Sequence, residues 1–180
     1  MFKSIEKLMD EYLVKKAPFQ IPANGRKGLV EWFPWIALIF GILQLLAAWN
    51  LWRAGHYVDQ VVNYWNDISR AYGVDTPTYD LGPTYYVAVG AIVVSAALLL
   101  IAFPGLKDKS KKRGWDILLI STLFNLAYGV IAVFVDGRYG GGFGSLLGAA
   151  LGALIGFYLL AQVKSLYSDK GESKKKPAEK

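Results

Sequence analysis

The 180-residue sequence contains no cysteine and a single histidine, His56. Disulfides, thiolate metal sites and cysteine nucleophiles are therefore excluded, and so is a metal site built from several histidines. Charged side chains are also missing from the middle of each long apolar segment. Proton relays and charge-coupled transporters usually place such groups at membrane depth, so their absence argues against a proton-coupled pump built from one chain. No nucleophile or ligand set indicates an enzyme, and the sequence predicts no catalytic site, metal or cofactor.

Apolar residues make up 54% of the chain and are concentrated in four blocks that are almost free of charge. Each block has about 20 residues, the length at which a helix crosses the hydrocarbon core of a bilayer. Tryptophans at both ends of the first block are typical of the two membrane–water interfaces. The predicted fold class is therefore all-α, with a membrane domain at residues 32–163. Its four spans are expected at about residues 32–52, 84–103, 115–135 and 143–163.

Residues 1–31 are polar and basic, but Ile5, Met9 and Tyr12 fall on one face of a helix, with Glu6 on the opposite face. This pattern predicts an N-terminal segment with a short amphipathic helix that lies on the cytoplasmic membrane surface. Packing of the same face on another protein is the alternative.

A second amphipathic pattern lies in the longest loop, residues 53–83, where Val58, Val62 and Trp65 share a helical face. We expect a second interfacial helix there, on the outer surface. The end of the loop is rich in turn-forming residues and is expected to be irregular.

The distribution of cations predicts the topology. Residues 1–31 hold six Lys and Arg, residues 105–114 hold five and residues 164–180 hold six, whereas the opposite side holds only Arg53, Arg70 and Arg138. Because cytoplasmic loops carry the excess of cations, both termini and the basic loop are expected in the cytoplasm. Residues 164–180 are expected to form a disordered basic tail.

The basic loop is expected to contact anionic lipid headgroups rather than nucleic acid, because its cations lie directly beside two membrane spans. The residues predicted to make this contact are Lys107, Lys109, Lys111, Lys112 and Arg113.

Glycines recur every four residues in the fourth span, as in a glycine zipper, at Gly144, Gly148, Gly152 and Gly156. Each glycine costs up to about 1 kcal/mol relative to alanine inside a helix, so a row of them needs a reason. Close approach of a second backbone is the usual one. We expect the row to pack against the third span across the short turn. A seam between copies of the chain and a pore lining are the alternatives.

Two amide side chains are expected near the middle of the membrane, Gln44 in the first span and Asn125 in the third. An amide in hydrocarbon needs a hydrogen-bond partner, so they are expected to bond to each other or to backbone carbonyls. A small polar patch on a permeation or ligand path is the alternative.

Three stretches carry a resemblance to known proteins: EYLVKKAPFQIPAN followed by FPW, AFPGLKDKSKKRGW, and GALIGFYLLAQVKSLY. In this order, and over nearly the whole chain, the sequence resembles uncharacterised small four-span membrane proteins of candidate-phyla bacteria, the Saccharibacteria and their relatives. Some of those proteins are automatically labelled chromate transporter. The resemblance implies the four-span fold and a place in the bacterial cytoplasmic membrane.

Two hypotheses of function follow. The first is a non-catalytic membrane protein that acts as a scaffold, assembly factor or subunit through helix packing and partner contacts. The alternative is a small oligomeric transporter or channel for an ion or small molecule, which the glycine row and the two amides favour. The expected partners are the lipid bilayer, its anionic headgroups, and either further copies of the chain or another membrane protein.

The topology can be tested by labelling single cysteines in intact cells, since the chain has no cysteine of its own. An impermeant thiol reagent should label a cysteine at Asp67 and leave a cysteine at Lys111 unlabelled, because the cation bias places them on opposite sides. The reverse pattern would show that the orientation is wrong.

Overall fold

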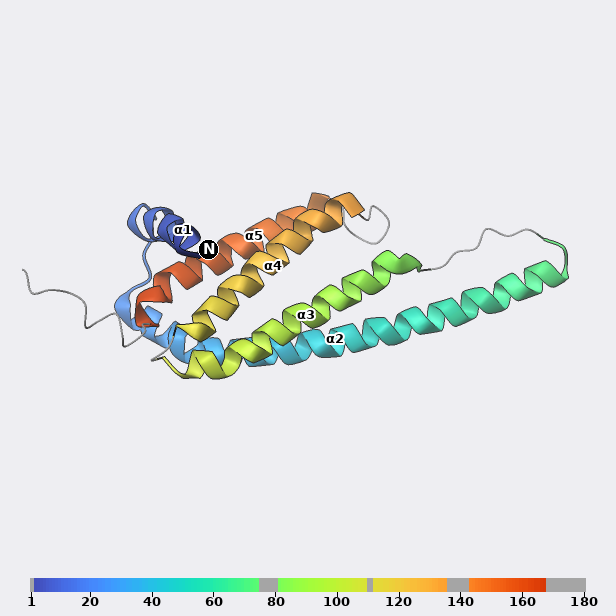
Figure 1. The fold of residues 1–180 in the computed structure, drawn as a ribbon, viewed down its shortest axis with the longest axis horizontal. Coiled ribbons are helices and arrows are strands. Elements are labelled where there is room, and N and C mark those ends of the chain that lie inside the picture. The colour runs from blue at the N-terminus through green and yellow to red at the C-terminus, as the bar shows by residue number, and fades with distance from the viewer. Residues whose placement is uncertain (1, 75–80, 110–111, 136–142, 168–180) are drawn as a thin grey trace, which may run out of the picture.

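The structure, a computed structural model, describes residues 2–74, 81–109, 112–135 and 143–167. These residues form helices and contain no strand (Figure 1). Four of the helices are long and apolar enough to cross a membrane, so the chain is a multi-pass membrane protein and the predicted four-span, all-α fold is confirmed. They are α2 (Ala23–Ala71), α3 (Gly82–Lys107), α4 (Arg113–Val135) and α5 (Phe143–Val163).

Three short elements complete the described chain. Helix α1 (Phe2–Met9) continues into a π-helical stretch (Asp10–Lys15), and a 3₁₀ turn (Lys164–Leu166) follows α5. The long helices form two antiparallel hairpins, α2 with α3 and α4 with α5, which meet through α3 and α4. The hairpins lie close together at the end that carries α1 and diverge toward the other end (Figure 1). We call these the proximal and distal ends.

Helix α2 is much longer than the predicted first span. Its 49 residues correspond to about 73 Å, more than twice the thickness of a hydrocarbon core. The expected boundary at residue 52 is not a boundary in the structure. Residues 53–71 are helical, as predicted, but they continue α2 instead of forming a separate helix. The irregular end expected for this loop falls mostly on residues 75–80, outside the described part of the chain.

Small residues spaced seven apart line the side of α2 that faces α3. Gly41, Ala48 and Gly55 are all buried. A Cβ at Gly41 would lie 2.9 Å from the side chain of Leu100, and one at Gly55 would lie 2.7 Å from the ring of Tyr85. A seven-residue repeat keeps one face of a helix turned toward its neighbour, and small residues let the backbones approach. We call this row of contacts the α2–α3 seam. The sequence analysis did not predict it, although the seven-residue spacing of the small residues can be seen in the sequence.

The turn between α3 and α4 depends on two glycines. A Cβ at Gly114 would lie 2.2 Å from the backbone of Gly105. Any residue larger than glycine at this position would therefore force the backbone to move. Pro104, inside the last turn of α3, precedes this contact. The two glycines therefore let α4 begin directly against the end of α3.

The proximal end holds the apolar core. Pro34 has no N–H and cannot bond to the carbonyl of Val30, four residues earlier in α2. That carbonyl accepts a long hydrogen bond, 3.5 Å, from the hydroxyl of Tyr167, which is buried. Residues 164–167, where the sequence predicted the start of a disordered tail, are therefore packed against α2. The remaining tail residues lie outside the described chain.

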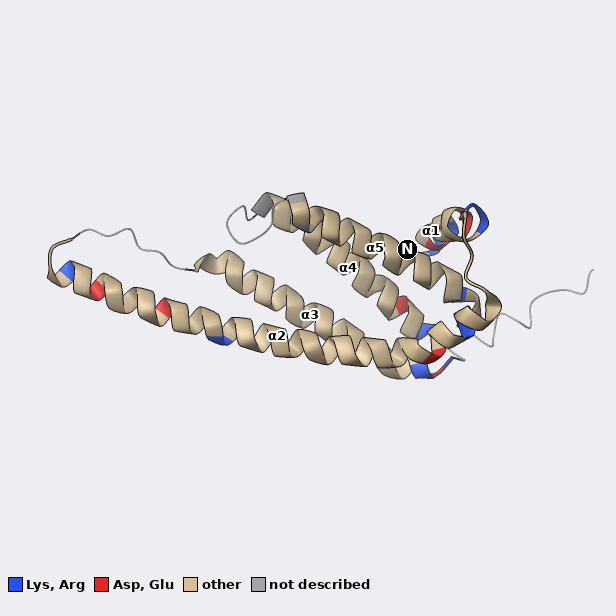
Figure 2. Ribbon diagram, turned by 180° about the vertical axis from the view of Figure 1, so that it is seen from behind, with Lys and Arg blue, Asp and Glu red and all other residues tan. Residues whose placement is uncertain are grey.

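Charged residues are most frequent at the proximal end and occur singly along the distal part of α2, while most of the length of α3, α4 and α5 carries none (Figure 2). This separation is what a helix needs to cross hydrocarbon, because a charged group at the bilayer centre is costly.

The continuity of α2 can be tested with nitroxide labels on Cys residues at Leu43 and Val61, which are both exposed. The two positions are five full turns apart on the same face, so a straight helix separates them by about 27 Å. A right-angle bend near residue 53 would shorten the separation to about 19 Å by the same rise per residue. Electron–electron double resonance measures the distance. Labels at Trp35 and Arg53, also five turns apart, are the matched control and should give about 27 Å in either case.

Candidate functional site

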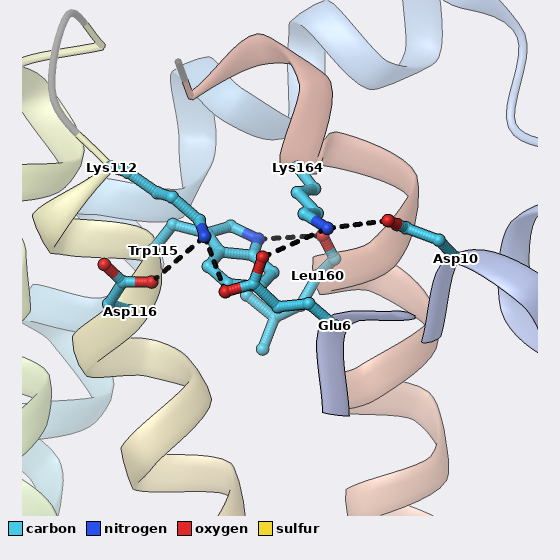
Figure 3. Close-up of polar contacts among 7 residues, drawn as sticks. All are labelled: Glu6, Asp10, Lys112, Trp115, Asp116, Leu160 and Lys164. Atoms are coloured by element: carbon cyan, nitrogen blue, oxygen red, sulfur yellow. Dashed lines mark hydrogen bonds and ion pairs between the residues drawn. The ribbon is translucent and has the colours of Figure 1, made fainter. Parts of the chain in front are cut away.

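An ion cluster joins α1, α4 and the end of α5 at the proximal end (Figure 3). Lys112 Nζ donates a 2.6 Å hydrogen bond to Glu6 Oε1, and Lys164 Nζ lies 3.2 Å from Glu6 Oε2. Each lysine also has a second carboxylate: Lys164 donates to Asp10 at 2.7 Å, and Lys112 lies 3.7 Å from Asp116. The Glu6 side chain is only 13% exposed, so water screens this cluster less than it screens an ordinary surface pair.

Glu6 is the centre of the ion cluster. Burial by itself raises the pKa of its carboxyl group, because it removes water from the charged form. Hydrogen bonds from Lys112 and Lys164, together with their charges, outweigh this effect and hold the pKa of Glu6 below its ordinary value of 4.5. The carboxylate is therefore ionised at neutral pH, and its single negative charge is shared by the two lysines, each of which also has a second carboxylate.

The ion cluster fixes α1 to the membrane domain. Met9 is buried in the same apolar core as Leu160, and Gln162 Nε2 donates a 2.9 Å hydrogen bond to the Leu13 carbonyl. The predicted amphipathic helix is present, but its buried face meets α5 of the same chain, a partner that the sequence did not indicate. On this helix Leu8 remains exposed.

The end of α5 is also tied to the start of α4. The indole N–H of Trp115, which is fully buried, donates a 2.8 Å hydrogen bond to the Leu160 carbonyl. Leu160 is among the last four residues of α5, whose carbonyls lack a partner within the helix. Trp115 therefore caps α5 from α4 (Figure 3).

Lys112 makes contacts within the protein. Its ammonium group pairs with Glu6 and Asp116 and lies 4.9 Å from the ring centroid of Trp115. Contact of this residue with lipid stays a prediction.

The other cations of the basic loop remain candidates for lipid contact. Lys107 and Lys109 are exposed, as is Arg113. Lys107 Nζ lies 5.3 Å from the ring centroid of Trp35, a tryptophan expected at the membrane interface. Lys111 lies outside the described residues.

The two mid-depth amides have different surroundings. Asn125 Nδ2 donates to the Ser121 carbonyl at 2.9 Å and to Ser95 Oγ at 3.1 Å, so Asn125 links α4 to α3. Asn125 therefore bonds to a backbone carbonyl, one of the two predicted arrangements, whereas the other, a bond between Gln44 and Asn125, is not formed. Gln44 Oε1 is buried and has no hydrogen-bond partner.

Gln44 lines an apolar cavity of about 220 Å³ between the four long helices. Phe40 and Gln44 of α2 form part of its wall, and the other helices contribute Leu99 of α3, Thr122 of α4, and Gly156 and Leu159 of α5. The cavity could not be predicted from the sequence, because its wall comes from residues up to 127 positions apart, Phe33 and Leu160.

The glycine row of α5 packs within the chain at one position only. A Cβ at Gly156 would lie 3.1 Å from Thr122 Cγ2 of α4. Outside α5 itself, no atom of the described chain lies within 4 Å of a Cβ built at Gly144, Gly148 or Gly152. The prediction that the row packs against the third span is therefore wrong at these three positions.

The close contact between α4 and α5 lies beside the glycine row. A Cβ at Gly129 of α4 would lie 2.4 Å from the Cβ of Ala149. The expected interface was thus placed on the correct helix but on a neighbouring face. An oligomer seam or a pore lining at the exposed glycines stays a prediction.

No family model matches this chain. No curated protein and no solved structure matches it either. Membership of the bacterial group that the sequence resembles therefore stays a prediction. Within the described residues, no group of three or more His, Asp and Glu side chains lies together as a metal site would require. Function has to be inferred from the geometry of this chain.

The ion cluster can be tested with Glu6→Gln, which keeps the shape of the side chain and removes its charge. We expect the free energy of unfolding at pH 7 to fall by about 1–3 kcal/mol, the usual range for hydrogen bonds to charged groups. Thermal melts in detergent measure the change. Glu11→Gln is the matched control, because Glu11 pairs with Lys16 at an exposed position and should contribute less than about 1 kcal/mol.

Acid should remove the difference between wild type and Glu6→Gln. The folded-state pKa of Glu6 is lowered, so its stabilising effect is complete above the ordinary value of 4.5 and is lost as the pH falls through the folded-state pKa. The two melting temperatures should therefore converge at low pH. An equal difference at pH 7 and well below the folded-state pKa would contradict the assignment.

Proposed function

We propose that this protein is a non-catalytic scaffold, assembly factor or subunit, and that it binds another membrane protein through the distal part of α2. The main support for this proposal is the continuation of α2 past residue 52. Residues 53–71 extend about 28 Å beyond the predicted span. We call residues 57–71 the distal arm.

Large aromatic side chains are exposed along the distal arm. Tyr57 is 69% exposed, Tyr64 is 65% and Trp65 is 61% exposed. Tyr and Trp are enriched at protein interfaces and dominate their binding energy, because each ring buries a large area at little cost in conformational entropy. The arm carries few charges, and its pair Asp67–Arg70 is an exposed one at 3.6 Å. Such a surface suits a partner with an apolar groove.

Helix α3 holds the base of the distal arm in place. Gly55 lies against the ring of Tyr85, and the hydroxyl of Tyr86 donates a hydrogen bond to Asp59. Among the described helices, only α2 continues past the start of α3 at this end (Figure 1). A helix that is anchored at its base loses less freedom when it binds than a free segment would, which favours association.

The proposal also includes the membrane in which the protein lies and its orientation there. We place the chain in a bacterial cytoplasmic membrane, with both termini and the basic loop in the cytoplasm and the distal arm outside. The bias of cations supports this orientation. Exposed Lys107, Lys109 and Arg113 are then close to anionic headgroups of the inner leaflet.

A small oligomeric transporter or channel is the second candidate, and the exposed glycines of α5 favour it. Because no described atom lies near a Cβ at Gly148 or Gly152, a helix of a second copy could approach this face closely. Four helices rarely enclose a pathway alone, so this function would need an oligomer.

The proposal can be tested by replacing Tyr64 with a photo-crosslinking amino acid in cells that express the chain at its native level. We expect one discrete protein adduct of another mass. Trp65→Ala, which removes the neighbouring ring, should reduce the adduct at least about fivefold, as expected for a hot-spot residue. Gln60→Ala is the matched control on the same helix and should leave the yield unchanged, because Gln60 is an exposed polar residue without a ring.

Other outcomes would contradict the proposal. Adducts with lipid alone would show that the arm lies in the bilayer. Adducts between copies, with an oligomer whose mass in detergent falls in Gly148→Leu, would favour the transporter candidate instead.

A further inference from the structure

We infer that the cavity beside Gln44 binds a small, lipid-soluble molecule with one or two rings and a hydroxyl group, which enters from the bilayer. This inference does not depend on the distal arm or on its partner. It rests on one unpaired amide, on the size and lining of the cavity, and on its position within the membrane domain.

The side-chain amide oxygen of Gln44 accepts no hydrogen bond from the described chain. This atom, Oε1, is also buried, which is an unfavourable state for an unpaired polar atom in a low-dielectric interior. Asn125, the other mid-depth amide, uses both ends of its side chain in bonds to α3 and α4. A leucine at position 44 would fill similar space without this cost. Gln44 therefore has the properties of a group that is satisfied by a molecule from outside the chain.

The cavity has room for a ring but not for a whole lipid. Its volume is about 220 Å³, whereas an engineered apolar cavity of about 150 Å³ in another protein holds benzene. Its wall is apolar apart from two side chains, Gln44 and Thr122. The hydroxyl of Thr122 already donates a 3.0 Å hydrogen bond to the Leu118 carbonyl. Gln44 thus supplies the directional group, as in small-molecule sites where a few polar atoms orient an apolar ligand.

A hydroxyl group fits Gln44 better than other polar groups do. It can donate to Oε1, and it can equally accept from Nε2 if the amide is turned over. A water molecule is a poorer occupant, because it needs two to four polar partners and this apolar wall does not provide them. The ligand therefore combines an apolar body with a hydroxyl, as phenols, naphthols and ring alcohols do.

The cavity is open at its rim, where Ile36 and Phe40 are 42% and 56% exposed. Both residues lie within the predicted first span, so the rim faces hydrocarbon and the ligand must dissolve in the membrane. Gln162 Oε1 is also buried without a partner, but Gln162 lines neither of the two described cavities.

The test compares 2-naphthol with naphthalene, which differ by one hydroxyl group. Saturable binding to the full chain in lipid nanodiscs is measured by equilibrium dialysis, with empty nanodiscs subtracted and concentrations referred to the lipid phase. We expect 2-naphthol to bind about fivefold or more tightly than naphthalene, as one hydrogen bond to a buried amide provides. In Gln44→Leu the two affinities should agree within about twofold, because the amide is gone.

Two pairs of variants keep the test independent of folding. Gln44→Leu should melt at or above the wild-type temperature, since it replaces an unpaired amide, whereas Asn125→Leu should melt lower. Ile36→Trp should block the rim and abolish saturable binding of both probes. Ile39→Trp is its matched control, exposed on the same helix but outside the cavity wall, and should leave binding unchanged. Equal affinities in the wild type, or a hydroxyl preference that survives in Gln44→Leu, would overturn the inference.

Discussion

Close packing of neighbouring helices at small residues is the interaction on which the rest of this structure depends. Lipid tails are as apolar as leucine, so no hydrophobic force pulls spans together, and dispersion contact has to do so. Gly41 and Gly55 of α2 leave room for side chains of α3. Gly105 and Gly114 bring the backbones together at the α3–α4 turn, and Gly129 of α4 leaves room for Ala149 of α5. The helices are therefore held as two hairpins joined at one end, and the space where they diverge becomes available for other uses.

At the proximal end, ion pairs stabilise the structure in addition to this packing of helices. Glu6, Lys112 and Lys164 lie far apart in the sequence, yet their contacts draw α1 onto the ends of α4 and α5. Carboxylates and ammonium groups can meet there because the helices leave the hydrocarbon, so the cost of removing them from water is moderate. The distal end has no comparable cluster among its described residues. Its stability comes from the contact between α2 and α3, and α2 continues beyond that contact without cover from another described helix.

Sequence patterns predicted the features that depend on local composition. Spans α4 and α5 begin and end within two residues of the expected positions, because hydropathy changes sharply at their ends. The length of α2 could not be predicted in this way. After Trp52 the chain becomes mixed in polarity, which fits an interfacial helix as well as a continued one, and contacts of Gly55 and Asp59 with α3 decide between them. The ion cluster was not predictable either, since the sequence shows charges but not which of them meet.

Glycine spacing and mid-depth amides show how the surroundings decide the role of a residue. The four-residue glycine row of α5 is the more conspicuous pattern, but the described chain leaves Gly148 and Gly152 uncovered, while a sparser seven-residue pattern in α2 forms the contact. The two mid-depth amides also differ in their surroundings. Both Gln44 and Asn125 are costly in hydrocarbon, and Asn125 recovers that cost through bonds to two helices. The side-chain oxygen of Gln44 has no hydrogen-bond partner in its own chain, and Gln44 lines a cavity. Packing alone therefore gives no reason for an amide at that position.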